Sequence, residues 1–473
     1  MLAHSPPLPL VIDYFNILSN CDEGVILALE QRHRVRRVRL CMMDVSGLQK
    51  LIMAMDKEYP VLEYLILVTM AAWGDLALVL PKPLEAPNLR HLFLTGVVPL
   101  IESRLLTSAV GMVTLCLFMQ QPSSYFQPDI LVQCLSSMPQ LETLLVTIIY
   151  PIPDHVKRQL SESDTPIKTR VTLPNLRWFQ FEGSGTYMEA VVHRIIAPCL
   201  EKLNIQLNNE ITLPVPHLAQ FMNTTNNLRF DSAAFEISRN RGSVMLYLRE
   251  EPEVYSLSIT VLDFSWHRDM QVLSSVGQIF NSLSQKISTV EHLSLEHKAS
   301  PEEHDEPEVD PGEWRKFLRL FRCVKTLSID DRLVEEVSRC LESDDGERPS
   351  ELFPVLQELT YSGNNHTSGA FTSFVNARQN TGHPVTLNVP SRSSSCLGVS
   401  ESSDVMTESN DAWSSDAWSS VAWGNDAESS EAWCNNAGSS EAWCNNAGSS
   451  EAWGINESQT TPSHTNVRKF KTD

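Results

Sequence analysis

Several short runs of serine, histidine and acidic residues resemble catalytic groups, but none has the spacing that a known mechanism needs. Gly183-Ser184-Gly185 lacks the G-x-S-x-G arrangement of a nucleophile elbow. Cys434 and Cys444 stand ten residues apart, which is too far for a zinc knuckle. A further group lacks the H-E-x-x-H spacing of a zinc-binding helix: Glu291, His292, Glu296, His297, Glu303 and His304. We therefore expect no enzyme, and no metal, nucleotide or cofactor site.

A single basic cluster lies near the N-terminus. Its members are Arg32, Arg34, Arg36, Arg37 and Arg39. They alternate with Val35, Val38 and Leu40, so the period of two predicts the solvated face of a first strand. Single-strand nucleic-acid sites combine such charges with aromatic stacking platforms, and the sequence shows none beside this cluster. We expect no nucleic-acid partner.

The composition also limits the function. The chain has 473 residues, 37 basic and 58 acidic side chains, a net charge of −21 and 42 % hydrophobic residues. Such acidity opposes broad attraction to nucleic acid or to anionic membranes. No apolar run approaches the roughly 20 residues of a spanning helix, and the first residues do not form a signal peptide. The ten cysteines form no CxxC pair, so we expect reduced thiols and a cytoplasmic or nuclear protein.

The chain changes character near Pro390. Residues 391–473 carry 12 acidic and four basic side chains, a net charge of −8, which leaves −13 for the rest. A ten-residue unit recurs there, EAWCNNAGSS at Glu431–Ser440 and again at Glu441–Ser450. Isolated tryptophans among small polar residues cannot build a core, so this tail is predicted to be disordered. Two interpretations stay open: the indoles insert into pockets of a partner, or the repeat is low complexity without function.

A different repeat runs through the first 390 residues. Its pattern is apolar-x-x-apolar-x-apolar, often introduced by proline, as in PVLEYLIL, PNLRHLFL, PQLETLLV and PNLRWFQF. Twelve copies start 23 to 36 residues apart, and two of the twelve, which begin at Thr225 and Val254, are weaker. The end of each copy alternates as a short strand does. Helical patterns lie between them, for example at Leu48, Leu51 and Ile52.

Strand, helix and next strand, repeated many times, predict an α/β leucine-rich-repeat solenoid, a curved parallel sheet with outer helices. A doubly wound domain also alternates strands and helices, but it does not repeat one strand pattern twelve times. We expect an N-terminal lead-in over residues 1–24, the solenoid over 25–390 and the disordered tail over 391–473. An exposed loop is predicted at Lys298–Gly312, which is rich in acid and proline.

Longer stretches resemble one protein family. They are VILALEQRHRVRRVRL, LQKLIMAMDKEYPVLEYL, APNLRHLFLTG, MPQLETLL, FMNTTNNLRFDSAAFE and AFTSFVNARQNTGHPVTL. These are similar to the repeat region of F-box-like leucine-rich-repeat proteins of mushroom-forming fungi. In that family an F-box precedes the repeats and docks onto the adaptor of an SCF-type ubiquitin ligase. This sequence begins where the family's repeat region begins, so the resemblance implies a substrate receptor whose adaptor contact needs an F-box upstream.

The repeat geometry also predicts a binding surface. In L-x-x-L-x-L the third and fifth residues point away from the helices, onto the concave face. Aromatic and arginine side chains are frequent there, as in protein-binding hot spots. The candidates are Arg36, Arg37, Arg39, Tyr64, Arg90, His91, Phe93, Trp178, Lys202 and His292. For each, the alternative is an ordinary residue of a sheet face. The resulting hypothesis is a non-enzymatic scaffold that binds a protein partner, and the alternative is a repeat protein whose partner or ligand is unrelated to ubiquitination.

Overall fold

The computed structural model describes thirteen stretches of the chain: residues 8–16, 23–69, 78–98, 103–119, 126–149, 170–208, 215–238, 241–252, 254–262, 271–298, 311–341, 352–361 and 369–389. The chain divides into two compact units, Met1–Ser393 and Ser394–Asp473. All described residues belong to the first unit. The predictions for the tryptophan tail and for most of the Lys298–Gly312 loop fall outside them.

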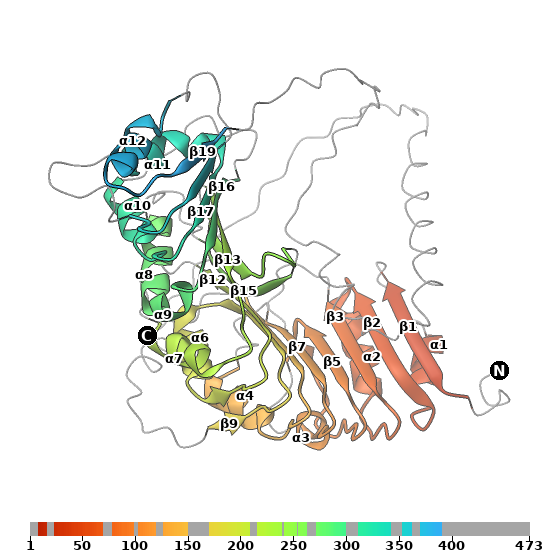
Figure 1. The fold of residues 1–473 in the computed structure, drawn as a ribbon. Coiled ribbons are helices and arrows are strands. Elements are labelled where there is room, and N and C mark those ends of the chain that lie inside the picture. The colour runs from red at the N-terminus through yellow and green to blue at the C-terminus, as the bar shows by residue number, and fades with distance from the viewer. Residues whose placement is uncertain are drawn as a thin grey trace, which may run out of the picture. The chain divides into compact units, whose positions relative to one another are not determined.

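The first unit is built on one 15-stranded sheet (Figure 1). Its strand order is β1-β2-β3-β5-β7-β8-β10-β12-β15-β14-β13-β16-β17-β18-β19. The strands before the middle are Leu10–Asn16 (β1), Val35–Met42 (β2), Tyr64–Thr69 (β3), His91–Thr95 (β5), Thr114–Met119 (β7), Thr143–Ile148 (β8), Trp178–Gly183 (β10) and Lys202–Asn208 (β12). The others are Ser232–Ser238 (β13), Arg241–Tyr247 (β14), Tyr255–Leu262 (β15), His292–His297 (β16), Thr326–Ile329 (β17), Glu358–Tyr361 (β18) and Thr386–Asn388 (β19). Two pairs form small separate sheets: Leu78–Val79 (β4) with Val97–Val98 (β6), and Val171–Thr172 (β9) with Ile195–Ile196 (β11).

The register of this sheet repeats the sequence pattern from strand to strand. Leu65 of β3 lies beside Val38 of β2 and Leu92 of β5. Farther along, Phe179 of β10 lies between Leu144 and Leu203. Each apolar position therefore stacks on the same position of the next repeat, and the buried side chains form one continuous core. A single repeat could not bury this face alone, which is why the array is long.

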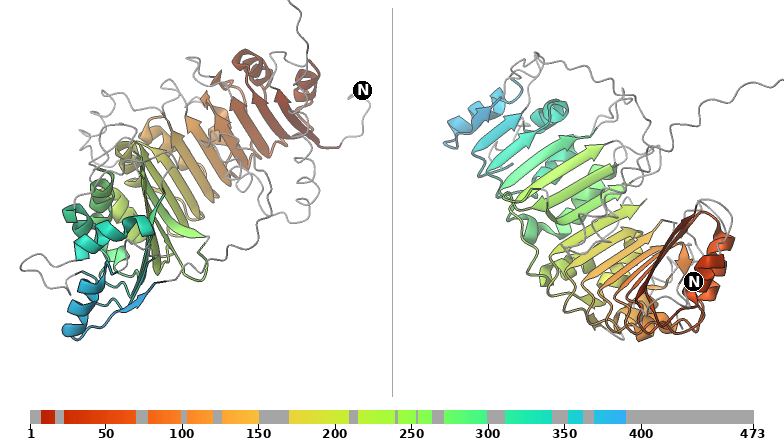
Figure 2. Two further views of the ribbon diagram at one scale, coloured as in Figure 1. Left: turned by 90° about the horizontal axis from the view of Figure 1, so that it is seen from above. Right: turned by 90° about the vertical axis from the view of Figure 1, so that its right-hand side faces the viewer.

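Helices cover the face of the sheet that carries the apolar rows, and the sheet curves with them on its outer side (Figure 2). Those between the earlier strands are Glu23–Leu29 (α1), Val45–Ala54 (α2), Arg104–Ser108 (α3), Pro128–Leu135 (α4), Gly185–Val192 (α6) and Pro216–Thr224 (α7). The later ones are Gln271–Ser282 (α8), Ser284–Ile287 (α9), Pro311–Leu318 (α10), Val334–Leu341 (α11) and Thr372–Asn380 (α12), with a 3-10 turn at Asp331–Leu333. In α2 the predicted positions Leu48, Leu51 and Ile52 are all buried. The fold is thus the predicted α/β leucine-rich-repeat solenoid.

Asparagine side chains tie neighbouring repeats together at the strand entrances. Asn88, in the PNLRHL copy, donates a hydrogen bond of 2.6 Å to the carbonyl of Pro60 in the preceding repeat. Asn175, in the PNLRWF copy, donates one of 3.1 Å to the carbonyl of Pro139. The proline before each strand cannot donate from its own nitrogen, but its carbonyl can accept a hydrogen bond, so the motif positions a link between repeats.

The sheet departs from the sequence prediction in two places. Residues 1–24 were expected as a lead-in, but β1 lies within them and pairs with β2 in parallel. The copy starting at Thr225 predicted a strand through Leu228 and Phe230. Those side chains are buried outside any strand, and the strand is β13 instead.

The middle of the array contains a hairpin that the repeat pattern did not predict. β14 pairs antiparallel with β13 on one side and with β15 on the other. Only two residues, 239 and 240, join β13 to β14. A connection this short cannot return the chain for a parallel pair, so the strands must form a hairpin. β15 then lies next to β12, and β13 lies next to β16, both in parallel.

Candidate functional site

The strand register brings one residue of each repeat into a row on the face away from the helices. We call it the concave row. Following the pairing, it contains Arg37, Tyr64, His91, Thr114, Thr143, Trp178 and Lys202 and, from the hairpin onward, Tyr247, Ser232, His292 and Thr326. β15 separates these two runs, and its register with β14 shifts at Tyr247. Five of the predicted binding residues therefore lie in the first run, and His292 lies in the second. Two clusters of side-chain contacts lie along the concave row.

The first cluster is a stack of side chains on β2, β3 and β5. The guanidinium carbon of Arg37 lies 5.5 Å from the ring centre of Tyr64. The Tyr64 ring in turn stacks on His91, with ring centres 4.3 Å apart and an interplanar angle of 11°. Nδ1 of His91 and Oγ1 of Thr114 are 3.1 Å apart, within hydrogen-bonding distance. An aromatic group thus accompanies the basic cluster, contrary to the sequence prediction, but both faces of the Tyr64 ring are covered by its neighbours.

Two further arginines of β2 are held by acidic residues. Arg36 forms an ion pair of 2.9 Å with Glu63, and Arg39 lies 3.7 Å from Asp13 of β1. Both pairs are partly exposed, so each contributes little to stability but holds its guanidinium in place. Arg90 is exposed and flanks the row at the entrance of β5. Two of the three arginines of β2 are therefore compensated by carboxylates.

Phe93 is predicted to lie on an accessible surface, but the structure buries it. Its side chain is only 3 % exposed, and its register neighbours Ile66, Cys116 and Leu145 are also buried. These four apolar side chains contribute to stability rather than to an accessible surface. Trp178 is half-buried and Lys202 is exposed, so both are accessible on the concave row.

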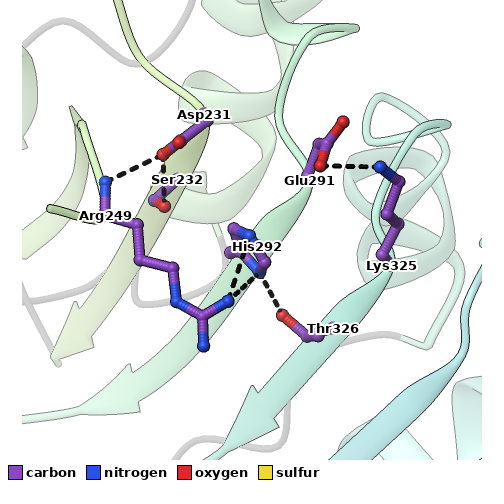
Figure 3. A network of polar contacts seen from close by, with 7 residues as sticks. All are labelled: Asp231, Ser232, Arg249, Glu291, His292, Lys325 and Thr326. Atoms are coloured by element: carbon purple, nitrogen blue, oxygen red, sulfur yellow. Dashed lines mark hydrogen bonds and ion pairs between the residues drawn. The ribbon is translucent and has the colours of Figure 1, made fainter.

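The second cluster lies where β13, β14, β16 and β17 meet (Figure 3). Asp231 accepts a hydrogen bond of 2.7 Å from Oγ of Ser232 and one of 2.9 Å from the backbone N–H of Arg249. Burial acts to raise the pKa of the Asp231 carboxyl, but the hydrogen bonds that it accepts and the charge of His292 together lower that pKa. Beside it, Lys325 and Glu291 form an ion pair of 2.7 Å. The two carboxylates of this cluster are therefore both engaged.

His292 occupies the centre of the second cluster. Its Nδ1 lies 2.6 Å from Oγ1 of Thr326, and Nη1 of Arg249 lies 3.4 Å from Nδ1 and 3.3 Å from Nε2. No single donor can point along the lone pairs of both ring nitrogens, so the guanidinium lies against the ring. Burial lowers the pKa of His292, and the charge of Arg249 lowers it further. Both effects favour the uncharged ring.

Sequence reasoning found His292 but missed its neighbours. Asp231 and Arg249 flank the hairpin, which the hexad pattern did not predict. The available signal was the continuous apolar run Val244–Tyr247, which is consistent with a strand buried on both faces.

In the described part of the chain, the residues compared above with catalytic and metal-binding motifs do not form such sites. Ser184 is buried at the start of α6, after a strand that ends at Gly183. Within the described stretches, no group of three or more histidine, cysteine or acidic residues could hold a metal ion. His292 and Glu291 contact different partners, Thr326 and Lys325. No helix in the described part of the chain is both long and apolar enough to span a membrane.

Comparison with known proteins gives a fold-level likeness at most. No family model matches the sequence, and no curated protein matches it. Among solved structures, the chain is similar to the "Crystal structure of TLR13-ssRNA13 complex". The identity is 11 % and the TM-score 0.32, over 82 % of this chain and 46 % of that one. The chain therefore spans less than half the length of that protein. The fold assignment above depends on the sheet register and not on this likeness.

Proposed function

We propose that this protein is a non-enzymatic scaffold that binds a protein partner across the concave row. The observation that supports this most is the row itself, in which strand pairing aligns aromatic, basic and hydroxyl side chains from distant repeats in two runs, one on each side of β15. Tyrosine, tryptophan and arginine dominate hot spots of protein interfaces. Because the hydrogen-bonded sheet holds these side chains, little ordering entropy is lost on binding.

The resemblance to F-box-like proteins suggests a more specific role, in which the bound protein is a ubiquitination substrate. Support for this comes from the sequence stretches named above and from the solenoid they form. The adaptor contact would need an F-box, so the full native gene product is the protein to examine. The alternative is a repeat-based binder whose partner or ligand is unrelated to ubiquitination; for it, partner lifetime is unchanged when the proteasome is blocked.

Substitutions on the two faces of the sheet test the scaffold proposal. The double variant Tyr64→Ala/Trp178→Ala removes two aromatic groups from the concave row, and Met53→Ala removes an exposed side chain from α2 on the helical face. Partners of the full chain are purified from cell extract and quantified by mass spectrometry. We expect the double variant to lose its specific partners by about tenfold or more, as hot-spot truncations do, and Met53→Ala to retain them.

The measurement also has outcomes against the proposal. Equal recovery of every partner by the double variant and by Met53→Ala would show that the concave row does not bind them. Absence of an SCF adaptor from the purified full native gene product would exclude the ligase role alone. Thermal unfolding of each variant is the control for folding.

A further inference from the structure

Arg249 is the charged group of the second cluster whose side chain has no acidic partner among the described residues. Within these stretches, its guanidinium contacts only the ring of His292, at 3.3 and 3.4 Å. Its backbone N–H, not its side chain, binds Asp231. Arginine on a protein surface is commonly paired with a carboxylate or phosphate in a two-pronged arrangement. Here that arrangement is not made within the described part of the chain.

The acidic residues nearby have other partners. Asp231 binds the Ser232 hydroxyl and the Arg249 backbone, and Glu291 binds Lys325. At this point the concave row presents the His292 ring and the Thr326 hydroxyl, and the Arg249 guanidinium lies beside them (Figure 3). When the ring is protonated, Nδ1–H of His292 can donate to Oγ1 of Thr326, which leaves Nε2–H, the Thr326 hydroxyl and the guanidinium to donate hydrogen bonds to one negatively charged group.

We propose that Arg249, His292 and Thr326 bind an oxyanion of the protein partner, either a carboxylate side chain or a phosphorylated residue. This deepens the proposed function, because it names the chemistry that the partner presents to the concave row. The guanidinium supplies the charge and the two-pronged geometry. The imidazole and the hydroxyl supply directional donors that fix the position of the oxyanion.

Binding of the oxyanion is coupled to the protonation of His292. Arg249 and Lys325 oppose the positive charge of the ring, whereas Asp231 and Glu291 favour it. The other titratable groups near the ring are Tyr247 on β14, Glu296 on β16 and, beyond Thr326, Glu358 on β18. An added negative charge favours the imidazolium. The bound state therefore takes up a proton, and affinity increases as the pH falls through the titration of His292.

Short synthetic peptides test this directly. Fluorescein-labelled hexaglutamate, its hexaglutamine counterpart and a matched phosphoserine peptide are titrated with the full chain at low ionic strength, and fluorescence anisotropy reports binding. We expect hexaglutamate to bind saturably, about tenfold more tightly at about pH 6 than at about pH 8. The affinities of hexaglutamate and of the phosphoserine peptide are compared at about pH 8, where the phosphate is fully charged, to distinguish a carboxylate from a phosphate ligand.

Three variants separate this site from general attraction. Arg249→Gln is expected to weaken hexaglutamate binding by about tenfold or more. His292→Gln keeps a hydrogen-bonding group beside Thr326, so it is expected to remove the pH dependence and leave residual binding. Arg177→Gln is the matched control, because Arg177 lies elsewhere on the strand entrances and is paired with Glu201. The affinity of Arg177→Gln for hexaglutamate should stay within about twofold of the wild-type value.

Each result of the peptide titrations either supports or overturns the oxyanion proposal. Saturable binding that depends on Arg249 and on the pH supports the proposal. No saturable binding of either acidic peptide, equal binding of hexaglutamine, or equal losses from Arg249→Gln and Arg177→Gln would overturn it. The scaffold proposal would survive such a failure if Tyr64→Ala/Trp178→Ala still loses partners. If wild type binds the acidic peptides as expected but Tyr64→Ala/Trp178→Ala loses no partners, the oxyanion site is supported and the scaffold role is contradicted.

Discussion

Glu189 shows how a single side chain on the helical face responds to pH. It lies on α6, is 8 % exposed, and accepts hydrogen bonds of 2.9 Å from the backbone N–H groups of His217 and Leu218 at the start of α7. Burial raises the pKa of its carboxyl from 4.5 to about 7, although the two N–H groups oppose this. Next to it the rings of His193 and His217 stack 3.6 Å apart. Burial lowers the pKa of each of these histidines.

The raised pKa makes a prediction about stability. Because folding favours the protonated form of Glu189, its contribution is complete below about pH 4.5 and is lost as the pH rises through about 7. Glu189→Gln is neutral at every pH and removes this dependence. We expect the difference in unfolding free energy, variant minus wild type, to rise by on the order of 2 kcal/mol between about pH 5 and about pH 8. Denaturant unfolding at each pH measures it.

The design of this experiment separates Glu189 from its neighbours. His193 and His217 have lowered pKa values, so their contribution to the free energy of unfolding decreases as the pH falls. The contribution of Glu189 instead decreases as the pH rises. Both histidines are present in the variant and in the wild type, so their effects largely cancel in the difference. Glu201→Gln changes an exposed glutamate and should give a curve parallel to wild type. A parallel curve for Glu189→Gln as well would contradict the prediction.

At the scale of elements, β14 joins the two halves of the parallel sheet. Leu246 of β14 is fully buried and lies opposite Ala233 of β13 and Leu257 of β15. Leu246→Ala leaves a cavity between these strands, and we expect it to lower the free energy of unfolding by about 2–5 kcal/mol. Arg241→Ala, at the exposed start of the same strand, should cost less than about 0.5 kcal/mol. Equal effects of the two substitutions would show that the hairpin does not connect the halves.

The same hairpin explains which parts of the structure could be predicted from the sequence. The strands that alternate with a period of two after a fixed apolar residue could be predicted, because each copy must bury an apolar side chain at the same two positions. At Thr225–Phe230 the anchor pattern recurs, but Leu228 and Phe230 are buried ahead of the strand. A hexad with three apolar positions cannot distinguish a buried turn from a strand. The oxyanion site was missed for this reason, because the reversal of the chain between β13 and β14 brings Arg249 beside the start of β13.

At the scale of the whole array, each repeat is stabilised mainly by its two neighbours. β8, near the middle, has five buried residues out of six. β19, at one end, has none buried, and β1, at the other end, has one. In repeat proteins of this kind, stability is roughly a sum of nearest-neighbour terms. Within the described sheet, β1 and β19 each pair with one strand instead of two, so local opening should be easiest there.

Hydrogen exchange followed by mass spectrometry can resolve this gradient. We expect amides of β8 to exchange at least about tenfold more slowly than those of β1 and β19, after correction for intrinsic rates. Leu144→Ala, in the core of β8, should accelerate exchange in the adjacent strands β7 and β10, because they pack directly on it. Leu387→Ala in β19 is the end-of-array counterpart and should change exchange only in β18 and β19. Uniform exchange in the wild type, or equal spread from both substitutions, would mean that the array opens as one unit and not repeat by repeat.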